Sequence, residues 1–507
     1  GVKVRLFGQI RQGRYAKEMV HPECRVIDPA NPPPLEKTLT AIYPTTEGLG
    51  QVRLRKLIEQ ALLISEDLDL SHEEELLPKA LHESLDLPNL HEAIRFIHHP
   101  PKGTELSFAS KRSHPAQKRL IFEELLAHQI SLKEKRLNRS KHIAPRCGPI
   151  QKYTLLKNRI GFSLTKGQSD AISDISNDLQ SGVPMLRLLQ GDVGSGKTVV
   201  AAMAASMLIE EGYKVVIMAP TELLVEQHRR TFETWFPREE VIALTGKLSE
   251  RERHLVKSRI RNKVPAIVIG THAVFQEDLI YANLGLIVVD EQHRFGVGQR
   301  LALNQKGDSR EFKAHQLIMT ATPIPRTLAM AAYADLDIST IKDLPPGRNP
   351  VATAVIPEER RKEVIARISA AIGDGAQVYW VCPLIEESDK IETESAIKTA
   401  SLLSMEIENV EVGLIHGRMN EIDKEKIMGN FINGRINLLV ATTVIEVGVD
   451  VPNASLMIIE NAERLGLAQL HQLRGRVGRG EKQSSCLLLY KTPLSDMAEQ
   501  RLGAIRA

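Results

Sequence analysis

Short, almost wholly apolar runs alternate with helical patterns over the C-terminal two thirds of the chain. Each run has the length of a strand that is buried on both faces of a sheet. The first series is Met185–Leu189, Val215–Met218, Ile267–Ile269, Leu286–Val289 and Leu317–Met319, and the second, after Leu344-Pro345-Pro346-Gly347, is Val378–Val381, Val412–Ile415, Leu438–Ala441, Leu456–Ile459 and Cys486–Leu489. Because buried strands separated by helices form parallel sheets, the sequence predicts two tandem α/β domains, over residues 151–345 and 346–507.

The N-terminal third has a different pattern. Residues 1–30 alternate apolar and polar positions around a turn at Gln12-Gly13-Arg14, which predicts a small β-domain that begins abruptly, as though earlier strands were missing. Phe7 and Tyr15 stand among basic residues such as Arg14, a mixture typical of nucleic-acid surfaces, although Phe7 could equally belong to a core. Residues 31–150 begin with a proline-rich linker and continue with helical spacing, which predicts a helical connector.

Composition narrows the class of protein. The 507 residues are 42% hydrophobic and 25% charged, and no apolar run is long enough for a membrane span, so we expect no membrane association. The four cysteines lie far apart, which predicts neither a disulfide framework nor a metal site and suits the cytoplasm. The net charge is only +3, but residues 1–25 and 111–146 are strongly basic and could meet nucleic-acid phosphates or simply form a solvated surface.

Residues 191–198, Gly-Asp-Val-Gly-Ser-Gly-Lys-Thr, match the phosphate-loop pattern between a predicted strand and a predicted helix. In this motif Gly191, Gly194 and Gly196 let backbone N–H groups surround a phosphate. Lys197 would reach the outer phosphates, and Thr198 would offer a hydroxyl to Mg²⁺. The pattern predicts an ATP-type nucleotide site in the first α/β domain.

Two further clusters follow predicted strands or helices. Asp290 and Glu291 come directly after Leu286–Val289, where Asp290 could hold Mg²⁺ and Glu291 could orient the attacking water. In the second domain, Arg476 and Arg479 could direct guanidinium groups at a γ-phosphate that is held by the first domain, or could bind nucleic-acid phosphates instead. These clusters predict ATP hydrolysis in a cleft between the domains.

In this order and spacing the motifs resemble those of superfamily 2 helicases, and more narrowly the RecG family of bacterial branched-DNA translocases. The resemblance covers nearly the whole chain and rests on Leu164-Thr165 with Gln168, the phosphate loop, Ala219–Leu224, Leu244-Thr245-Gly246, Gly270-Thr271-His272, Asp290–Val297, Thr320–Thr327, Leu414–Met419, Ala441–Ala454 and Gln469–Gly480. The related transcription-repair coupling translocases typically carry Asp-Glu-Glu-Gln where this chain has Asp290-Glu291-Gln292-His293, which favours RecG.

The resemblance implies two RecA-like parallel-sheet domains after a partial OB-fold wedge and the helical connector. It implies adenine recognition by Phe162 and Gln168, arginine fingers at Arg476 and Arg479, and contacts to nucleotide and DNA by Gly448 and Asp450. The DNA-binding residues that we expect are Phe7, Arg14, Tyr15, Thr221, Thr271 and Thr443. We also expect the family's later helical hairpin to be missing after Ala507.

The expected activity is ATP- and Mg²⁺-dependent remodelling of forks and four-way junctions by a monomer at the bacterial nucleoid, with single-strand DNA-binding protein as a candidate partner. Two other functions remain open from the residues alone. An RNA helicase would share the ATPase motifs, and a DNA-binding or polymerase-tethered module could use the nucleotide site as a regulatory switch.

Overall fold

The computed structural model describes most of the chain. The described residues are 2–13, 16–20, 22–28, 30, 38–67, 75–105, 113–152, 155–246, 248–276, 278–291, 312–321, 336–345, 350–383, 389–407, 410–442, 451, 453–478, 480 and 483–506. The chain divides into two compact units, residues 1–131 and 132–507. The domain boundaries predicted at residues 30, 150 and 345 stay predictions.

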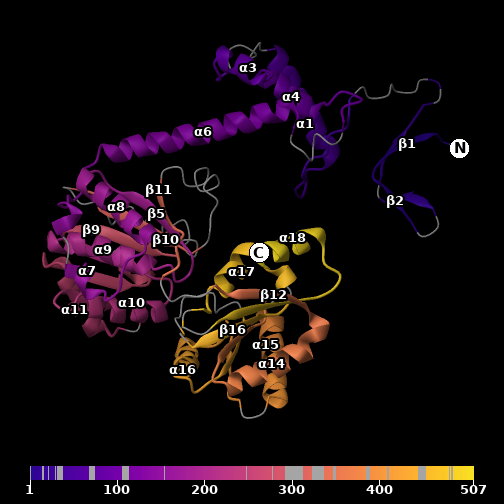
Figure 1. The fold of residues 1–507 in the computed structure, drawn as a ribbon. Helices are drawn as coiled ribbons and strands as arrows, with labels where there is room; N and C mark the ends of the chain where they lie inside the picture. Colours follow the sequence, from indigo (N-terminus) through magenta and orange to yellow (C-terminus); the bar gives the residue numbers. More distant parts are fainter. Residues whose placement is uncertain are drawn as a thin grey trace. The chain divides into compact units, whose positions relative to one another are not determined.

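The first unit contains short strands and then helices (Figure 1). Its strands form two antiparallel pairs, β1 (Val4–Phe7) with β4 (Glu23–Val26) and β2 (Ile10–Gln12) with β3 (Lys17–Met19). The strands agree with the predicted β-domain, whereas its identity as part of an OB-fold stays a prediction. The helices are α1 (Gln51–Asp67), α3 (Lys79–Leu85), α4 (Leu90–His98) and α6 (Pro115–Ser140), which crosses into the second unit.

The second unit contains two parallel sheets, and we call the part that holds the first sheet the first lobe. This sheet has seven strands that all pair in parallel. In spatial order they are β11 (Asp337–Ile341), β5 (Leu186–Gly191), β10 (His315–Thr320), β9 (Leu284–Asp290), β6 (Lys214–Met218), β8 (Ala266–Gly270) and β7 (Glu240–Leu244). Its helices are α7 (Leu155–Arg159), α8 (Lys166–Ser181), α9 (Lys197–Glu210), α10 (Glu222–Trp235) and α11 (Glu250–Arg261).

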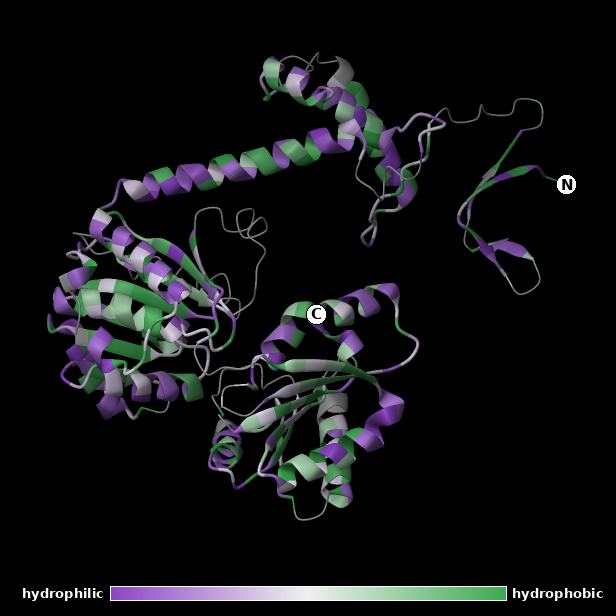
Figure 2. Ribbon diagram, viewed as in Figure 1, coloured by the Kyte–Doolittle hydropathy of each residue, from purple (hydrophilic) through white to green (hydrophobic). Residues whose placement is uncertain are grey.

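Both faces of this sheet are buried, as the apolar runs predict. Alternate residues of β6 belong to different hydrophobic clusters: Val215 and Ile217 pack with α8 and α9, whereas Val216 and Met218 pack on the opposite face. This alternation follows from the two-residue period of a strand. The strands appear hydrophobic in Figure 2, whereas α6 alternates between hydrophobic and hydrophilic residues along its length.

The second lobe holds a six-stranded parallel sheet. Its strands, in spatial order, are β12 (Ala352–Pro357), β17 (Ser485–Tyr490), β16 (Ala454–Ile459), β13 (Gln377–Val381), β15 (Leu438–Ala441) and β14 (Val412–Ile415). Helices α14 (Arg361–Gly373) and α15 (Asp389–Glu406) pack on one face, and α16 (Glu421–Ile432), α17 (Leu467–Arg474) and α18 (Asp496–Arg506) pack on the other. The prediction of two α/β domains in tandem is therefore confirmed.

Three strands were not predicted, and all three lie at sheet edges: β7 and β11 in the first sheet and β12 in the second. An edge strand is covered less completely than a central one, so its sequence need not be a wholly apolar run. Three of the five residues of β11, Asp-Ile-Ser-Thr-Ile, are polar, and every residue of β12 is at least partly exposed.

Two further features of the described residues concern the cysteines and the polarity of the helices. All four cysteines are free, and Cys24 is exposed whereas Cys147, Cys382 and Cys486 are buried. Among the residues that the structure describes, every helix is too short or too polar to cross a membrane.

Candidate nucleotide site

The phosphate loop joins β5 to α9. Gly194 and Gly196 have φ angles of +78° and +84°, a left-handed backbone conformation that glycine adopts without strain. Gly196 is the N-cap of α9 and has no side chain that could accept a hydrogen bond from the first turn of the helix. The loop therefore presents the positive end of a helix dipole with no side-chain cap, which is the geometry that binds phosphate.

Lys197 is buried and folds back over the loop. Its ammonium group donates to the carbonyl oxygens of Gly191, at 2.7 Å, and of Asp192, at 3.0 Å. These contacts keep the charge inside the loop, where an anionic ligand could take over the hydrogen bonds.

Gln168 packs directly against the phosphate loop. Gln168 and Thr165 cap the start of α8 reciprocally, and the Gln168 side-chain amide donates to the carbonyl of Ser195 at 2.9 Å. A β-carbon on Gly196 would lie only 2.2 Å from the Gln168 amide nitrogen, so this contact requires glycine there. Phe162, the other residue expected to recognise adenine, is 52% exposed and accessible to a ligand.

Asp290 ends β9 beside a buried histidine of α10. Nε2 of His228 lies 3.2 Å from a carboxylate oxygen of Asp290. Burial acts to raise the pKa of Asp290, but the hydrogen bond with His228 and the charges of Lys197 and Arg476 hold it below its usual value. Asp290 therefore remains an anion that could hold Mg²⁺.

Glu291 follows in a left-handed conformation, with φ of +53°. Such a backbone costs a residue with a β-carbon about 1 kcal/mol or more and is common at functional sites. The conformation is fixed by β10, since the Glu291 N–H donates to the Met319 carbonyl at 3.0 Å. Burial and the neighbouring charge of Asp290 raise the pKa of Glu291. The two adjacent carboxyl groups thus have pKa values shifted in opposite directions, a pattern typical of catalytic pairs.

One cavity of about 210 Å³ brings the predicted groups of both lobes together. Lys197, Thr198, Asp290 and Glu291 line it from the first lobe, and Arg476 lines it from the second. Arg476 is buried and close enough to affect the pKa of both carboxyl groups.

The lobes also touch at the tip of the phosphate loop. Nε2 of His471, on α17, lies 3.0 Å from a carboxylate oxygen of Asp192, and this hydrogen bond is the main cause of the lowered pKa of Asp192. Nearby, a β-carbon on Gly475 would lie 2.6 Å from the β-carbon of Val193. Only glycine allows this approach of the second lobe to the loop.

Mg²⁺ fits the donor set of the cavity, because it prefers oxygen ligands and usually keeps several waters. The Thr198 hydroxyl and the Asp290 carboxylate supply two such ligands at the same cavity. Within the described ranges, no cluster of three or more His, Cys, Asp or Glu side chains could hold a metal ion.

The described residues that we expect to bind DNA lie on different elements of the chain. Phe7 lies on β1, is 40% exposed and has the Arg55 guanidinium 5.7 Å from its ring centre, so it is not a core residue. Thr221 caps α10, accepting from the Leu224 N–H, and Thr271 is buried after β8. Their roles in DNA binding stay predictions. Six predicted residues lie outside the described residues: Arg14, Tyr15, Thr443, Gly448, Asp450 and Arg479.

Sequence reasoning missed the two histidines at this site. His228 stands on the same face of α10 as the buried Leu224 and Val225, so its spacing could have indicated an inward-facing side chain. His471 falls inside a recognised motif, but no local pattern shows that it meets Asp192, 279 residues earlier in the chain.

Two family models match the parts of the chain that carry these groups. Residues 165–331 match the DEAD/DEAH box helicase family, and residues 361–481 match the helicase conserved C-terminal domain. The first match contains the phosphate loop and the two carboxylates, and the second contains Arg476.

Known proteins resemble the whole chain. The chain is 51% identical to the ATP-dependent DNA helicase RecG of Escherichia coli K12, over 100% of this chain and 73% of that protein. It is 49% identical to the protein of that name from Haemophilus influenzae, with the same coverage.

Solved structures agree with the sequence comparisons. A structure of RecG bound to a three-way DNA junction matches 99% of this chain and 65% of that chain, with 36% identity and a TM-score of 0.72. The DUF1998 helicase MrfA bound to DNA and AMPPNP is only 15% identical, with a TM-score of 0.54 over 74% of this chain and 56% of that chain, and shows a shared fold alone. By its motifs, its fold and its extensive identity with these relatives, the chain belongs to the RecG family of ATP-dependent DNA helicases.

Proposed function

We propose that this chain is an ATP-driven translocase that remodels branched DNA. Its substrates are stalled replication forks and Holliday junctions, which it interconverts by branch migration and fork regression during repair and recombination. One observation carries most of this proposal: Lys197, Asp290 and Glu291 of one lobe and Arg476 of the other line a single cavity. A nucleotide bound there would connect the two lobes, so its hydrolysis could change their separation.

Each group has a distinct role in the proposed reaction. Lys197 and the backbone of Gly191, Gly194 and Gly196 bind the phosphates, and Thr198 and Asp290 hold Mg²⁺, which neutralises phosphate charge when bound. Glu291 orients the attacking water.

Further groups from both lobes complete the site. Arg476 and Arg479 stabilise charge that develops on the transferred phosphoryl group. Phe162 and Gln168 recognise adenine. Gly448 and Asp450 connect the nucleotide to the DNA strand.

DNA-binding residues lie on the two lobes and, separately, on the N-terminal strands. Thr221, Thr271 and Thr443 contact the DNA backbone. Phe7, Arg14 and Tyr15 meet the junction, where an aromatic ring can stack on a splayed base. We further propose that the protein acts as a monomer at the bacterial nucleoid in the cytoplasm and meets single-strand DNA-binding protein there.

ATPase rates with different nucleic acids test this function. We expect forks and Holliday junctions to stimulate hydrolysis more than plain duplex, single-stranded DNA or RNA. Fork unwinding should require hydrolysis, so Lys197→Ala and Glu291→Gln should abolish both activities while leaving the fold intact. Stimulation by single-stranded RNA alone would select an RNA helicase. Full junction remodelling by Glu291→Gln would select a nucleotide-controlled switch.

A further inference from the structure

The N-terminal end of α8 contacts the phosphate loop through a side-chain hydrogen bond. Gln168 reaches the Ser195 carbonyl from the third position of this helix. A shift of the N-terminal end of α8 would therefore displace Gln168. This would disturb both its hydrogen bond to the phosphate loop and its expected contact with adenine.

A carboxylate from a distant part of the chain holds this helix start. Asp343 accepts a hydrogen bond from the backbone N–H of Gly167 at 2.6 Å, across 176 residues of sequence. Gly167 lies in the first turn of α8, where backbone N–H groups lack partners within the helix and where negative charge is favoured.

Glycines allow the segment around Asp343 to pack against the nucleotide elements. A β-carbon on Gly167 would lie 3.1 Å from the Asp343 carboxylate, and one on Gly191 would lie 3.2 Å from both the carbonyl oxygen and the β-carbon of Ile341. In the sheet, Ile341 is also paired with Gly191, the first residue of the phosphate loop. The end of β11 and the residues after it thus contact both the loop and the start of α8.

The segment that contains Asp343 connects the first lobe to the second. Asp343 follows β11, the last strand of the first sheet, and β12 of the second sheet begins nine residues later, at Ala352. A residue in this connection can link the nucleotide site to the chain that joins the lobes.

We propose that Asp343 is a positioning residue for the nucleotide. Its carboxylate fixes the start of α8, and thereby Gln168, in the orientation that binds adenine. The inference rests on the proposed ATP site but adds a residue outside all the recognised motifs, in the connection between the lobes.

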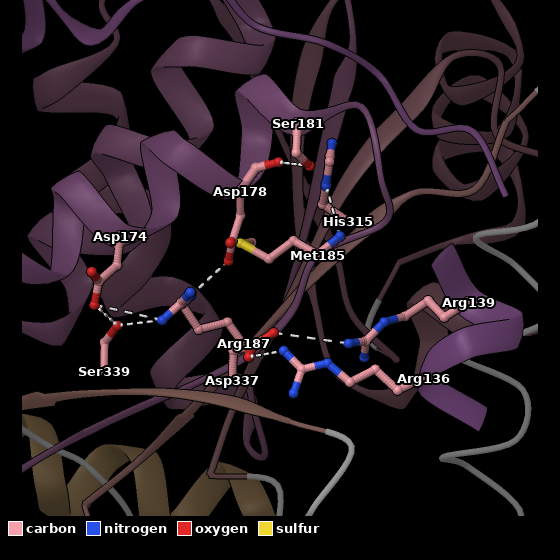
Figure 3. A network of polar contacts seen from close by, with 10 residues as sticks. All are labelled: Arg136, Arg139, Asp174, Asp178, Ser181, Met185, Arg187, His315, Asp337 and Ser339. Atoms are coloured by element: carbon pink, nitrogen blue, oxygen red, sulfur yellow. Dashed lines mark hydrogen bonds and ion pairs between the residues drawn. The ribbon is translucent and has the colours of Figure 1, made fainter. Parts of the chain in front are cut away.

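The opposite end of β11 provides a matched control. Asp337 pairs with Arg136 of α6 at 2.6 Å and lies 3.8 Å from Arg139 (Figure 3). It begins the edge strand that Asp343 follows and is also an aspartate, but its partners lie on α6 and not at the phosphate loop.

The test compares steady-state hydrolysis of ATP and GTP by the whole chain with saturating fork DNA. Asp343→Ala should raise the KM for ATP about fivefold, as expected for loss of a helix-capping hydrogen bond, and should change kcat less than about twofold. The KM for GTP should rise less, because guanine does not use the adenine contacts of Gln168, so the preference for ATP falls.

Two variants separate positioning from folding. Asp343→Asn keeps an oxygen that can accept from Gly167 and should restore most of the ATP preference. Asp337→Ala should leave both KM values at the level of the parent protein.

Equal KM values for ATP in Asp343→Ala and the parent would overturn the inference, and so would a loss of kcat for both nucleotides with no change in their KM ratio. If the parent protein itself does not hydrolyse ATP, the proposed function fails instead, so the two failures are distinguishable.

Discussion

Arg476 is the one described side chain of the second lobe that lines the cavity with Lys197, Asp290 and Glu291. If it stabilises charge in the transition state, it matters more for turnover than for binding. We expect Arg476→Ala to keep ATP affinity near that of the parent and to lower kcat by about 10³-fold. Equilibrium binding of a fluorescent ATP analogue and steady-state turnover measure the two effects. Arg435→Ala, at an exposed arginine of the same lobe, should change neither.

His315 links the first sheet to the segment after α6. Its Nδ1 accepts from the Met185 N–H at 3.0 Å, so Nε2 carries the proton and donates to the Pro145 carbonyl at 2.8 Å (Figure 3 shows the contact with Met185). Only the neutral ring can make both hydrogen bonds at once, because protonation of Nδ1 removes the acceptor for the Met185 N–H. Burial accordingly lowers the pKa of His315 to about 4.

This histidine should make stability depend on pH. Because the ring titrates near 6.5 in the unfolded chain and near 4 in the folded one, its contribution is complete above pH 6.5 and is lost as the pH falls toward 4. Between pH 7.5 and 5 the loss should be about 2 kcal/mol. Urea unfolding of His315→Gln, which can keep both hydrogen bonds, should lack this loss. A parent-like pH dependence in that variant would contradict the assignment, and His142→Gln, at an exposed site, should behave like the parent.

At the scale of single elements, a lysine of strand β6 caps the C-terminal end of helix α11. Lys214 of β6 is fully buried, and its ammonium group donates to the carbonyls of Asn262, the C-cap of α11, and of Val264. Cations are favoured at this end of a helix, where carbonyl groups lack partners. Burial lowers the pKa of Lys214, but these acceptors surround the ammonium group.

Removing that ammonium group should loosen the end of α11. Lys214→Met keeps most of the side-chain volume and leaves the carbonyls without their donor, so we expect the free energy of unfolding to fall by about 2–3 kcal/mol. Chemical denaturation measures this, and hydrogen exchange should rise first near residues 258–266. Lys263→Met, at an exposed neighbour, should cost less than about 0.5 kcal/mol. Equal stability of the two variants would exclude the capping role.

Central strands could be predicted from the sequence, whereas most edge strands could not. Central strands were predictable because residues such as Ile287 and Val288 must be apolar toward opposite faces of one sheet. Edge strand β11 was not, because Asp337 and Ser339 carry polar contacts to α6 and α8. At the site, Lys197 and Asp290 were predictable from local motifs. The partners of His228, His471 and Asp343 were not predictable, because each partner is distant in sequence.

At the scale of the whole molecule, the contact between Gly475 and Val193 determines how closely the lobes can approach. Gly475 has an ordinary helical φ of −67°, so alanine there would bring no backbone strain, only a methyl group 2.6 Å from the Val193 β-carbon. That methyl group would hold the second lobe away from the phosphate loop.

We therefore expect Gly475→Ala to lower turnover by about a hundredfold through misplacement of Arg476, with little change in thermal stability. Steady-state hydrolysis and a melting curve test this together. Gly503→Ala is the matched control, since a β-carbon there has no neighbour within 4 Å. Normal turnover in Gly475→Ala would mean that the lobes do not approach in this way during the reaction.

Because only one of the four cysteines is exposed, the protein can be labelled at a single site without mutation. Burial raises the pKa of Cys486 to about 12 and shields Cys147 and Cys382, whereas Cys24 on β4 faces solvent. Thiolates rather than thiols react with maleimides, so brief treatment of the native protein should attach a dye to Cys24 alone. An unmutated chain could then report, by fluorescence, when a junction reaches its N-terminal strands.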